Sequence, residues 1–286
     1  ESFEPLYQKI KNRNHILSLR LAMKKIYGID ITGVESIKRI NEAMKKQYRP
    51  GIYTRILRDI GNMEYVMVHA RWRSGIPKDL YPDFFRGSRV IDKMIIFDEP
   101  NDTSRFARFY GVEIRCVADM EEIYKRFVDE SVRNGAVGFK CSGAYLRDLD
   151  FSNPSREKAE AVLQKMLTNT ESHFSWAGGK ISLEEGRELS TYLMHAMLRQ
   201  IDKAKMPVAF HTGVVSVGGA GDVRRSNPQL LIPLFKEYKN INFDLYHSGY
   251  PYVTEFVELG KSWPNVYLNF CWSHSLSPTM ARRQLS

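Results

Sequence analysis

The sequence predicts an α/β protein of the (β/α)8 barrel class, also called a TIM barrel. Short apolar runs alternate with amphipathic helical segments, as in strand–helix units that build a parallel sheet. Two of these runs, 207–210 and 241–246, stop at His211 and His247, and each histidine precedes a glycine-containing pair. In a parallel barrel the carboxyl ends of the strands form the active-site face. The 286 residues match the length of one barrel, roughly 250 residues, so we expect a single domain.

The N-terminal segment 1–60 is predicted to be helical and to cover the barrel of 61–286. Residues 15–27 place apolar side chains at helical spacing, and Gly28 then ends the helix as a C-cap glycine. Further helices are expected at 34–48 and 51–60. This segment is too polar to form a core alone, so we interpret it as a helical insertion of one domain, 1–286.

In the barrel segment, strands are expected at 65–69, 90–97, 136–139, 207–210, 241–246 and 265–270. Helices are expected at 103–110, 120–134, 156–169, 183–204, 229–238 and 252–262. A closed barrel needs eight strands, and this chain begins without Met in one helical stretch and stops in another. We therefore expect the first and last barrel strands to lie outside it. An open doubly wound sheet is the alternative, but no GxGxxG turn follows any strand.

Composition narrows the classes of partner. The three cysteines are far apart and form no CxxC pair, which indicates a reducing compartment, and we expect a cytoplasmic protein. No apolar run approaches the roughly 20 residues that span a bilayer, and we expect no secretory leader. The net charge of +9 is spread along helix-like stretches without a nucleic-acid motif. We expect a small-molecule substrate, and the positive charge mildly favours an anionic one. We expect neither nucleic acid nor a membrane as a partner. A homo-oligomer is possible.

His211 and His247 are the predicted metal ligands. Imidazoles at consecutive strand ends would lie a few ångströms apart around one cleft, which suits a shared divalent ion. Zinc is the expected ion, with manganese as the alternative. For either histidine alone, the competing interpretation is a structural side chain bonded to a backbone carbonyl.

The strand at 136–139 is followed by three candidate catalytic residues. Lys140 stands beside apolar neighbours, where a lowered pKa would let it act as a base, form a Schiff base or carry a carbamate that binds metal. Tyr145 and Arg147 follow in the loop that should overhang the same face, and Arg147 could clamp a carboxylate. A solvated lysine at a loop edge is the alternative for Lys140.

The loops after the two histidines supply the remaining candidates. A Gly-rich loop after His211 resembles a substrate lid and ends in Asp222, a candidate catalytic residue, and in Arg224 and Arg225, candidates for substrate binding. The arginines could instead cap neighbouring helices. Tyr250 and Tyr252 either wall a pocket or pack the barrel rim.

The other histidines are weaker candidates. His69 ends the first expected strand, and His274 follows the last one. His15, His173 and His195 are interpreted as surface or packing residues. The P-loop, the GxSxG elbow and HExxH are absent, which leaves phosphoryl transfer and serine-esterase chemistry without support.

Four blocks, GFKCSGAYLR, PVAFHTG with GDVRRSNP, DLYHSGYPYV and WPNVYLNF, resemble the amidohydrolase superfamily. The resemblance covers about 136–280 and is closest to the branch near uronate isomerases and the amidohydrolase-like domain joined to some glutamine synthetases. It implies a metal-dependent barrel whose fifth- and sixth-strand histidines fall on His211 and His247. The fourth-strand lysine, carboxylated in some branches, falls on Lys140. The family's HxH pair and eighth-strand Asp have no counterpart here, in agreement with two strands lying outside the chain.

Three functions follow in order of preference. The first is a metal-dependent hydrolase that cleaves an amide, ester or lactone of a small polar or anionic substrate with metal-activated water. The second is a uronate-isomerase-like or decarboxylase-like enzyme on a hydroxy-acid, in which Tyr145 or Lys140 moves protons. The third is a non-catalytic binding barrel.

Overall fold

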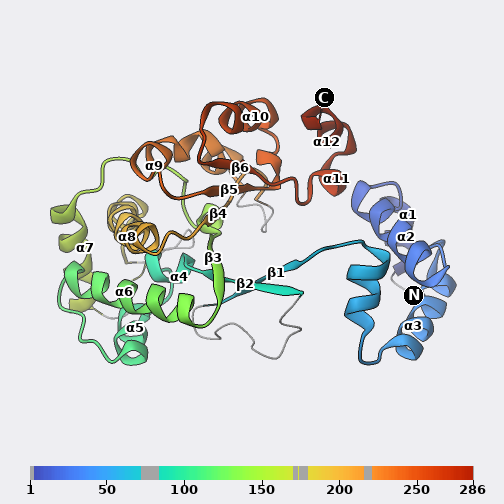
Figure 1. Cartoon of the computed structure of the whole chain (residues 1–286), viewed down its shortest axis with the longest axis horizontal. Helices are drawn as coiled ribbons and strands as arrows, with labels where there is room; N and C mark the ends of the chain where they lie inside the picture. Colours follow the sequence, from blue (N-terminus) through green and yellow to red (C-terminus); the bar gives the residue numbers. More distant parts are fainter. Residues whose placement is uncertain (1–2, 72–83, 170–172, 174–179, 216–220, 286) are drawn as a thin grey trace. The chain divides into compact units, whose positions relative to one another are not determined.

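A computed structural model describes residues 3–71, 84–169, 173, 180–215 and 221–285 (Figure 1). They belong to two compact units. The first unit lies within Glu1–Val66, Asp83–Phe85 and Trp272–Ser286, and the second within Met67–Pro82 and Arg86–Cys271. The boundaries expected from the sequence, one domain of 1–286 with a cover of 1–60, stay a prediction.

The first unit is helical around a small core. Its helices are α1 (Phe3–Ile10), α2 (Asn14–Tyr27), α3 (Val34–Gln47), the π-helix η1 (Thr54–Ile60), α11 (Ser273–Leu276) and α12 (Pro278–Leu285). Tyr7, Ile31 and Ile40 form its buried centre, and the Tyr7 hydroxyl donates to the Ile31 carbonyl at 2.6 Å. Gly28 ends α2 at φ 72°, in the left-handed conformation that favours glycine, as predicted.

The sheet has six strands in the described part of the chain (Figure 1). They are β1 (Val66–Ala70), β2 (Phe85–Val90), β3 (Ala136–Cys141), β4 (Val208–His211), β5 (Phe243–Tyr246) and β6 (Val266–Leu268). The strands pair in sequence order, and β2 to β6 are parallel. A doubly wound sheet reverses its strand order at a switch point. The consecutive order therefore confirms the barrel class and excludes that alternative.

Helices of the second unit pack against the sheet and against one another. They are α4 (Asp92–Ile95), α5 (Asp102–Tyr110), α6 (Val117–Arg133), α7 (Arg156–Thr168), α8 (Leu183–Lys203), α9 (Ile232–Glu237) and α10 (Val253–Ser262), with short 3-10 turns η2 (Gly143–Tyr145), η3 (Val223–Ser226), η4 (Pro228–Leu231) and η5 (His247–Gly249). The longest, α8, begins with a capping box in which Ser182 and Glu185 satisfy each other's backbone N–H groups. Much of α8 is buried, including Leu193, Met197 and Leu198. No helix within the described residues is both long and apolar enough to cross a membrane.

The predicted strand at 90–97 is wrong. The chain pairs as a strand over Phe85–Val90 and then turns into the short helix α4, which begins at Asp92. The apolar residues after Val90 in this stretch are buried in the helical arrangement, as they would be in a core strand, so a short apolar run does not distinguish a buried helical turn from a strand. The true strand was missed because Arg86 and Arg89 make it read as polar.

Asp102, the first residue of α5, predicts a pH-dependent stability. Its carboxylate accepts the Glu99 N–H at 3.0 Å, and burial raises its pKa to about 6. The carboxyl group therefore keeps its proton in the folded protein at pH values where the unfolded chain has already lost it. For this reason Asp102 makes the free energy of unfolding fall as the pH rises from about 4 to 6. We expect the free energy of unfolding of Asp102→Asn, taken relative to that of the wild type, to increase by about 1 to 3 kcal/mol from pH 4.5 to pH 7.5. Urea unfolding at the two pH values measures this change.

Asp119→Asn is the matched control for this prediction. Hydrogen bonds from the backbone N–H groups of Arg115 and Cys116 lower the Asp119 pKa. Its variant should therefore lose stability relative to the wild type as pH rises through the acid range. A difference for Asp102→Asn that does not change with pH would contradict the assignment.

Candidate active site

Two imidazoles meet at the carboxyl ends of β4 and β5. His211 is the last residue of β4, and His247 directly follows Tyr246, the last residue of β5. The strand register pairs His211 with Tyr246. The two imidazole rings have centroids 4.4 Å apart and are 2% and 5% exposed. The expected juxtaposition is therefore present, while a role as metal ligands stays a prediction.

Both rings are neutral near pH 7. Burial, then the neighbouring charge of His247 and of Lys140, lowers the pKa of His211 to about 3. Burial and Lys140 lower the pKa of His247 to about 4. The Val214 carbonyl lies 2.8 Å from His211 Nε2 and can only accept, so Nε2 carries the proton and Nδ1 has the lone pair. A neutral ring with a lone pair is the form that binds a metal ion.

Lys140 lies beside the two rings and is 4% exposed, which excludes the alternative of a solvated lysine. Its ammonium donates to the Cys141 carbonyl at 2.9 Å and to Ser142 Oγ at 3.3 Å, and it lies 4.8 Å from the centre of the Tyr246 ring. Burial lowers the Lys140 pKa, as predicted. The amine is therefore held at the strand ends by the protein's own acceptors.

Tyr145 joins this group from the turn η2. Its ring centroid lies 4.5 Å from that of His211. Partial burial raises the pKa of its hydroxyl, which therefore stays protonated near neutral pH. The structure thus brings together four residues predicted for the site: Lys140, Tyr145, His211 and His247.

Arg147 does not point to this group. Its guanidinium is 3% exposed and donates to Ser190 Oγ at 2.5 Å, to Thr191 Oγ1 at 3.0 Å and to the Arg187 carbonyl at 3.1 Å, all on α8. It also donates to the carbonyls of Asp148 and Asp150. These contacts fasten the loop after β3 to α8, whereas the sequence suggested a clamp for a substrate carboxylate. The donors that such a clamp would use are already bonded within the protein.

Asp222, Arg224 and Arg225 form a cluster at the turn η3, in which Arg224 is exposed and the other two are half-buried. The Asp222 carboxylate accepts from the Arg224 backbone and pairs with its guanidinium at 2.8 Å, and it lies 3.6 Å from Arg225 Nε. Asp222 therefore caps η3. Tyr252 adjoins this cluster, because the charges of Asp222 and Arg224 both affect its pKa. Tyr250 is half-buried after the turn at His247, and residues 216–220 of the proposed lid lie outside the described residues.

Sequence reasoning missed three groups of this site, Asp92 and Asp244 near Lys140 and Cys271 against His247. The Asp92 carboxylate accepts the Ser142 N–H and raises the Lys140 pKa against the larger effect of burial. Asp244 accepts from Asn269 at 3.3 Å. Cys271 Sγ lies 3.1 Å from His247 Nδ1. Strand alternation would have found Asp244, since it shares a sheet face with Tyr246 two residues on.

His69, a weaker candidate from the sequence, also lies at this end of the sheet. Its Nδ1 is 2.6 Å from Ser88 Oγ, and its ring centroid is 5.8 Å from that of Tyr246. Burial and the charge of Lys140 lower its pKa. His274, by contrast, lies in α11 of the first unit.

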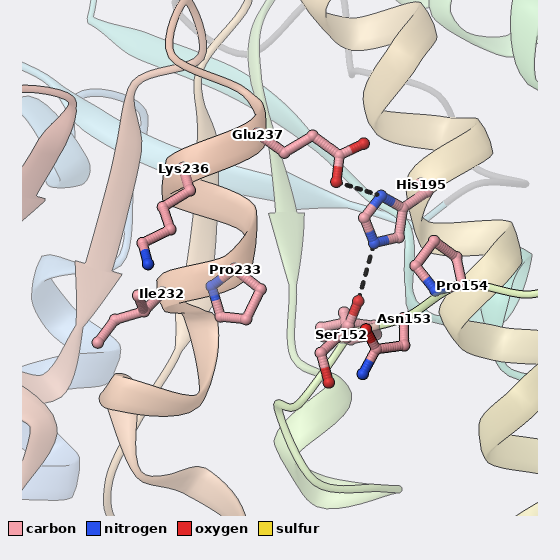
Figure 2. Close-up of a pocket in the computed structure, with 9 residues that line it drawn as sticks. Ser152, Asn153, Pro154, His195, Ile232, Pro233, Lys236 and Glu237 are labelled. Atoms are coloured by element: carbon pink, nitrogen blue, oxygen red, sulfur yellow. Dashed lines mark hydrogen bonds and ion pairs between the residues drawn. The ribbon is translucent and has the colours of Figure 1, made fainter.

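Two pockets of similar size differ in their relation to this group. One, of about 540 Å³, is lined by Asp92 and Leu146, the residue after Tyr145, and so adjoins the strand ends. The other, of about 530 Å³, lies between the loop at 151–154 and α9 (Figure 2). His195 forms its wall, with Nε2 donating to the Phe151 carbonyl at 2.8 Å and Nδ1 2.9 Å from the Tyr238 hydroxyl. His195 is therefore a packing residue, as expected.

Gly213 controls how closely the two histidine loops approach. Its φ is 74°, and a Cβ there would overlap the Tyr250 carbonyl oxygen and the Gly249 carbonyl carbon. Gly135 has a similar φ of 80°, but a Cβ added there would meet no atom of the described residues within 4 Å. We expect Gly135→Ala to lower the free energy of unfolding by about 1 kcal/mol, the cost of a left-handed alanine alone. Gly213→Ala should lower it by about 3 kcal/mol or more, because the added Cβ also overlaps backbone atoms. Thermal or urea unfolding measures both. Equal losses would show that this close approach relaxes freely.

Comparison with known proteins decides the family. Residues 104–284, more than half of the chain, match the family described as Amidohydrolase. The chain belongs to the amidohydrolase family. This confirms the resemblance inferred from the blocks around Lys140, His211 and His247.

Individual relatives of this amidohydrolase-family chain are distant. Protein fluG of Emericella nidulans is 24% identical over 247 residues, which is 82% of this chain but 27% of fluG. The chain thus spans about a quarter of that curated relative.

Two solved structures are similar in fold. A uronate isomerase from Thermotoga maritima matches with a TM-score of 0.75 and 14% identity, over 98% of this chain and 65% of its own. A protein from Lactobacillus casei assigned as a metal-dependent hydrolase matches with a TM-score of 0.66 and 18% identity, over 97% and 68%. At these identities the likeness establishes the fold of this amidohydrolase-family chain and leaves its reaction open.

Proposed function

We propose that this amidohydrolase-family chain is a metal-dependent hydrolase that cleaves an amide, ester or lactone bond in a small polar or anionic substrate. The observation that carries the proposal is the pair of neutral, buried imidazoles of His211 and His247, 4.4 Å apart, with the amine of Lys140 beside them. Family membership and the hydrolase of similar fold support the same class of reaction.

His211 and His247 would hold the ion, for which we propose zinc, with manganese as the alternative. Two neutral nitrogen donors fit zinc, but a catalytic zinc takes three protein ligands. Across the ranges that the structure describes, no three His, Cys, Asp or Glu side chains are placed to hold an ion together. Lys140 would serve as the adjacent nitrogen ligand or as the carbamate carrier, as the third group that holds the ion. When bound, a divalent ion supplies Lewis acidity and lowers the pKa of water near the substrate.

The chain's own side chains then do the remaining work. The protonated hydroxyl of Tyr145, next to His211, can donate a hydrogen bond to the substrate oxygen that gains charge. Lys140 would accept a proton in its neutral amine form, which burial favours by lowering its pKa. Arg224 and Arg225 give the exposed loop positive charge that favours an anionic substrate, and Tyr252 beside them would line the entrance.

A uronate-isomerase-like reaction on a hydroxy-acid is the second candidate. The similar fold of uronate isomerases favours it, together with two proton-transferring groups, Lys140 and Tyr145, flanking the histidines. In this case both groups would move protons between neighbouring carbons of the substrate. We also propose a cytoplasmic location for either enzyme.

The test combines metal analysis with product analysis. The purified protein, before and after reconstitution with zinc or manganese, is assayed against a panel of amides, esters, lactones and uronates. Stoichiometric metal with hydrolysis products supports the first proposal, and ketose–aldose interconversion of a uronate supports the second. Failure to bind either metal after reconstitution would contradict both and leave a non-catalytic barrel.

A further inference from the structure

The backbone at His247 is strained. His247, Ser248 and Gly249 have φ angles of 69°, 58° and 58°, so three successive residues are left-handed and two of them carry side chains. The left-handed conformation is unfavourable for residues with a side chain, because Cβ then crowds the following carbonyl oxygen. A turn of this kind persists only where the surrounding structure fixes it, and it is most often found at functional sites. The contacts that fix it are therefore informative.

The carboxyl end of β6 supplies these contacts. The Asn269 carbonyl accepts the Ser248 N–H at 3.1 Å, and the Asn269 N–H donates to the Leu245 carbonyl at 2.9 Å. The Asn269 side chain accepts the Cys271 N–H at 3.0 Å and donates to Asp244 at 3.3 Å. Asn269 thus ties the turn after β5 to the segment that carries Cys271.

Cys271 contacts the imidazole of His247 directly. Its Sγ lies 3.1 Å and its carbonyl oxygen 3.4 Å from Nδ1. A carbonyl can only accept, so this contact favours a proton on Nδ1, and a thiol sulfur can accept from the same N–H as a weak acceptor. The lone pair is then on Nε2. His211 is bonded through the opposite nitrogen, Nε2, to the Val214 carbonyl.

We propose that Cys271 is a positioning residue for His247: its sulfur and carbonyl hold Nδ1–H and so fix the ring orientation and the tautomer whose Nε2 can bind a metal ion. Histidine ligands commonly donate their second N–H to a protein acceptor, which sets the tautomer and raises ligand basicity. For the metal, the inference rests on the function proposed above. For the tautomer it rests only on the contacts of Cys271.

The first test uses the metal-free full chain. Long-range 1H–15N spectra of protein labelled at its seven histidines report which nitrogen of each ring is protonated. His247→Asn identifies the His247 signals by their loss. We expect the Nδ1–H form for His247 in the wild type and a smaller share of that form in Cys271→Ala, which keeps the carbonyl but loses the nearer sulfur. A wild-type signal of the Nε2–H form would overturn the proposal, whether or not the protein binds metal.

The second test measures zinc affinity by competition with a chelator. Cys271→Ala should weaken binding about tenfold to a hundredfold, and Cys271→Ser should recover part of the loss because its hydroxyl accepts a hydrogen bond. Cys116→Ala is the matched control, since Cys116 is also half-buried, and its affinity should not change. Thermal unfolding of each variant separates lost folding from lost positioning.

Two results in the metal-bound protein would overturn the positioning role. One is an unchanged zinc affinity in a folded Cys271→Ala variant. The other is a sulfur-to-cobalt charge-transfer band in the cobalt-substituted wild type, which would make Cys271 a ligand itself. If the wild type binds no metal, the proposed function fails and the tautomer spectrum still decides the role of Cys271.

Discussion

Replacing His211 by asparagine is expected to abolish stoichiometric zinc binding and to lower kcat/KM on the order of a thousandfold, about 4 kcal/mol of transition-state stabilisation. The physical reason is that the buried pair of His211 and His247 provides neutral nitrogen donors 4.4 Å apart, and one ring cannot replace both. Asparagine keeps a polar side chain of smaller size in the same place. Metal content by mass spectrometry and the rate on whichever substrate the panel identifies provide the measurements.

His15→Asn is the matched control for this variant. His15 is an exposed residue of α2, in the first unit, and the substitution is chemically the same. It should leave both the metal content and the rate as they are. If His211→Asn retains full metal content and rate, the pair of imidazoles is structural and the proposed function is wrong.

Replacing Arg147 by alanine is expected to destabilise the fold by about 3 to 5 kcal/mol, because six acceptors around a buried guanidinium lose their donor. Three of them, Ser190, Thr191 and the carbonyl of Arg187, lie on α8. The other three belong to the loop after β3 and are the carbonyls of Asp148 and Asp150 and the Asp148 carboxylate. The Arg147 guanidinium also packs over the Phe151 ring, 4.2 Å from its centre. Urea unfolding monitored by circular dichroism measures the loss.

Two variants sharpen this test. Arg147→Lys keeps the charge but cannot reproduce the planar set of donors. Its free energy of unfolding should therefore lie between those of Arg147→Ala and the wild type. Arg126→Ala removes an arginine that pairs with Glu122 on the surface and should change stability by less than about 0.5 kcal/mol. If Arg147→Ala is as stable as Arg126→Ala but raises KM for an anionic substrate, the clamp predicted from the sequence is correct after all.

The local sequence was sufficient to predict helices with a long periodic pattern and strands that end in a distinctive residue. Helices with sustained periodicity, such as α6 and α8, were predicted within a few residues. The two histidines were found because each stands where an apolar run stops, and parallel strands bring such positions to one edge of the sheet. The stretch 90–97 failed because a run of buried apolar residues is equally compatible with a strand and a helical turn.

The sequence predicted which loop carries a polar side chain better than it predicted what that side chain contacts. Arg147 and Tyr145 occupy the same loop, yet Tyr145 lies against His211 and Arg147 is bonded to α8. The sequence contains no signal for that difference, since α8 begins more than thirty residues later. Asp222, a candidate catalytic residue from the sequence, likewise accepts the Arg224 N–H and so caps its own turn.

The sequence by itself determined the strand–helix order, the family and the positions of His211, His247 and Lys140, because periodicity and strand ends are local properties of the chain. Only the tertiary structure decided which polar groups share a site and which hold the fold together. It placed Cys271 against His247 across 24 residues of sequence. It also bonded every donor group of Arg147 within the protein, since a buried guanidinium must find acceptors wherever the packed chain supplies them.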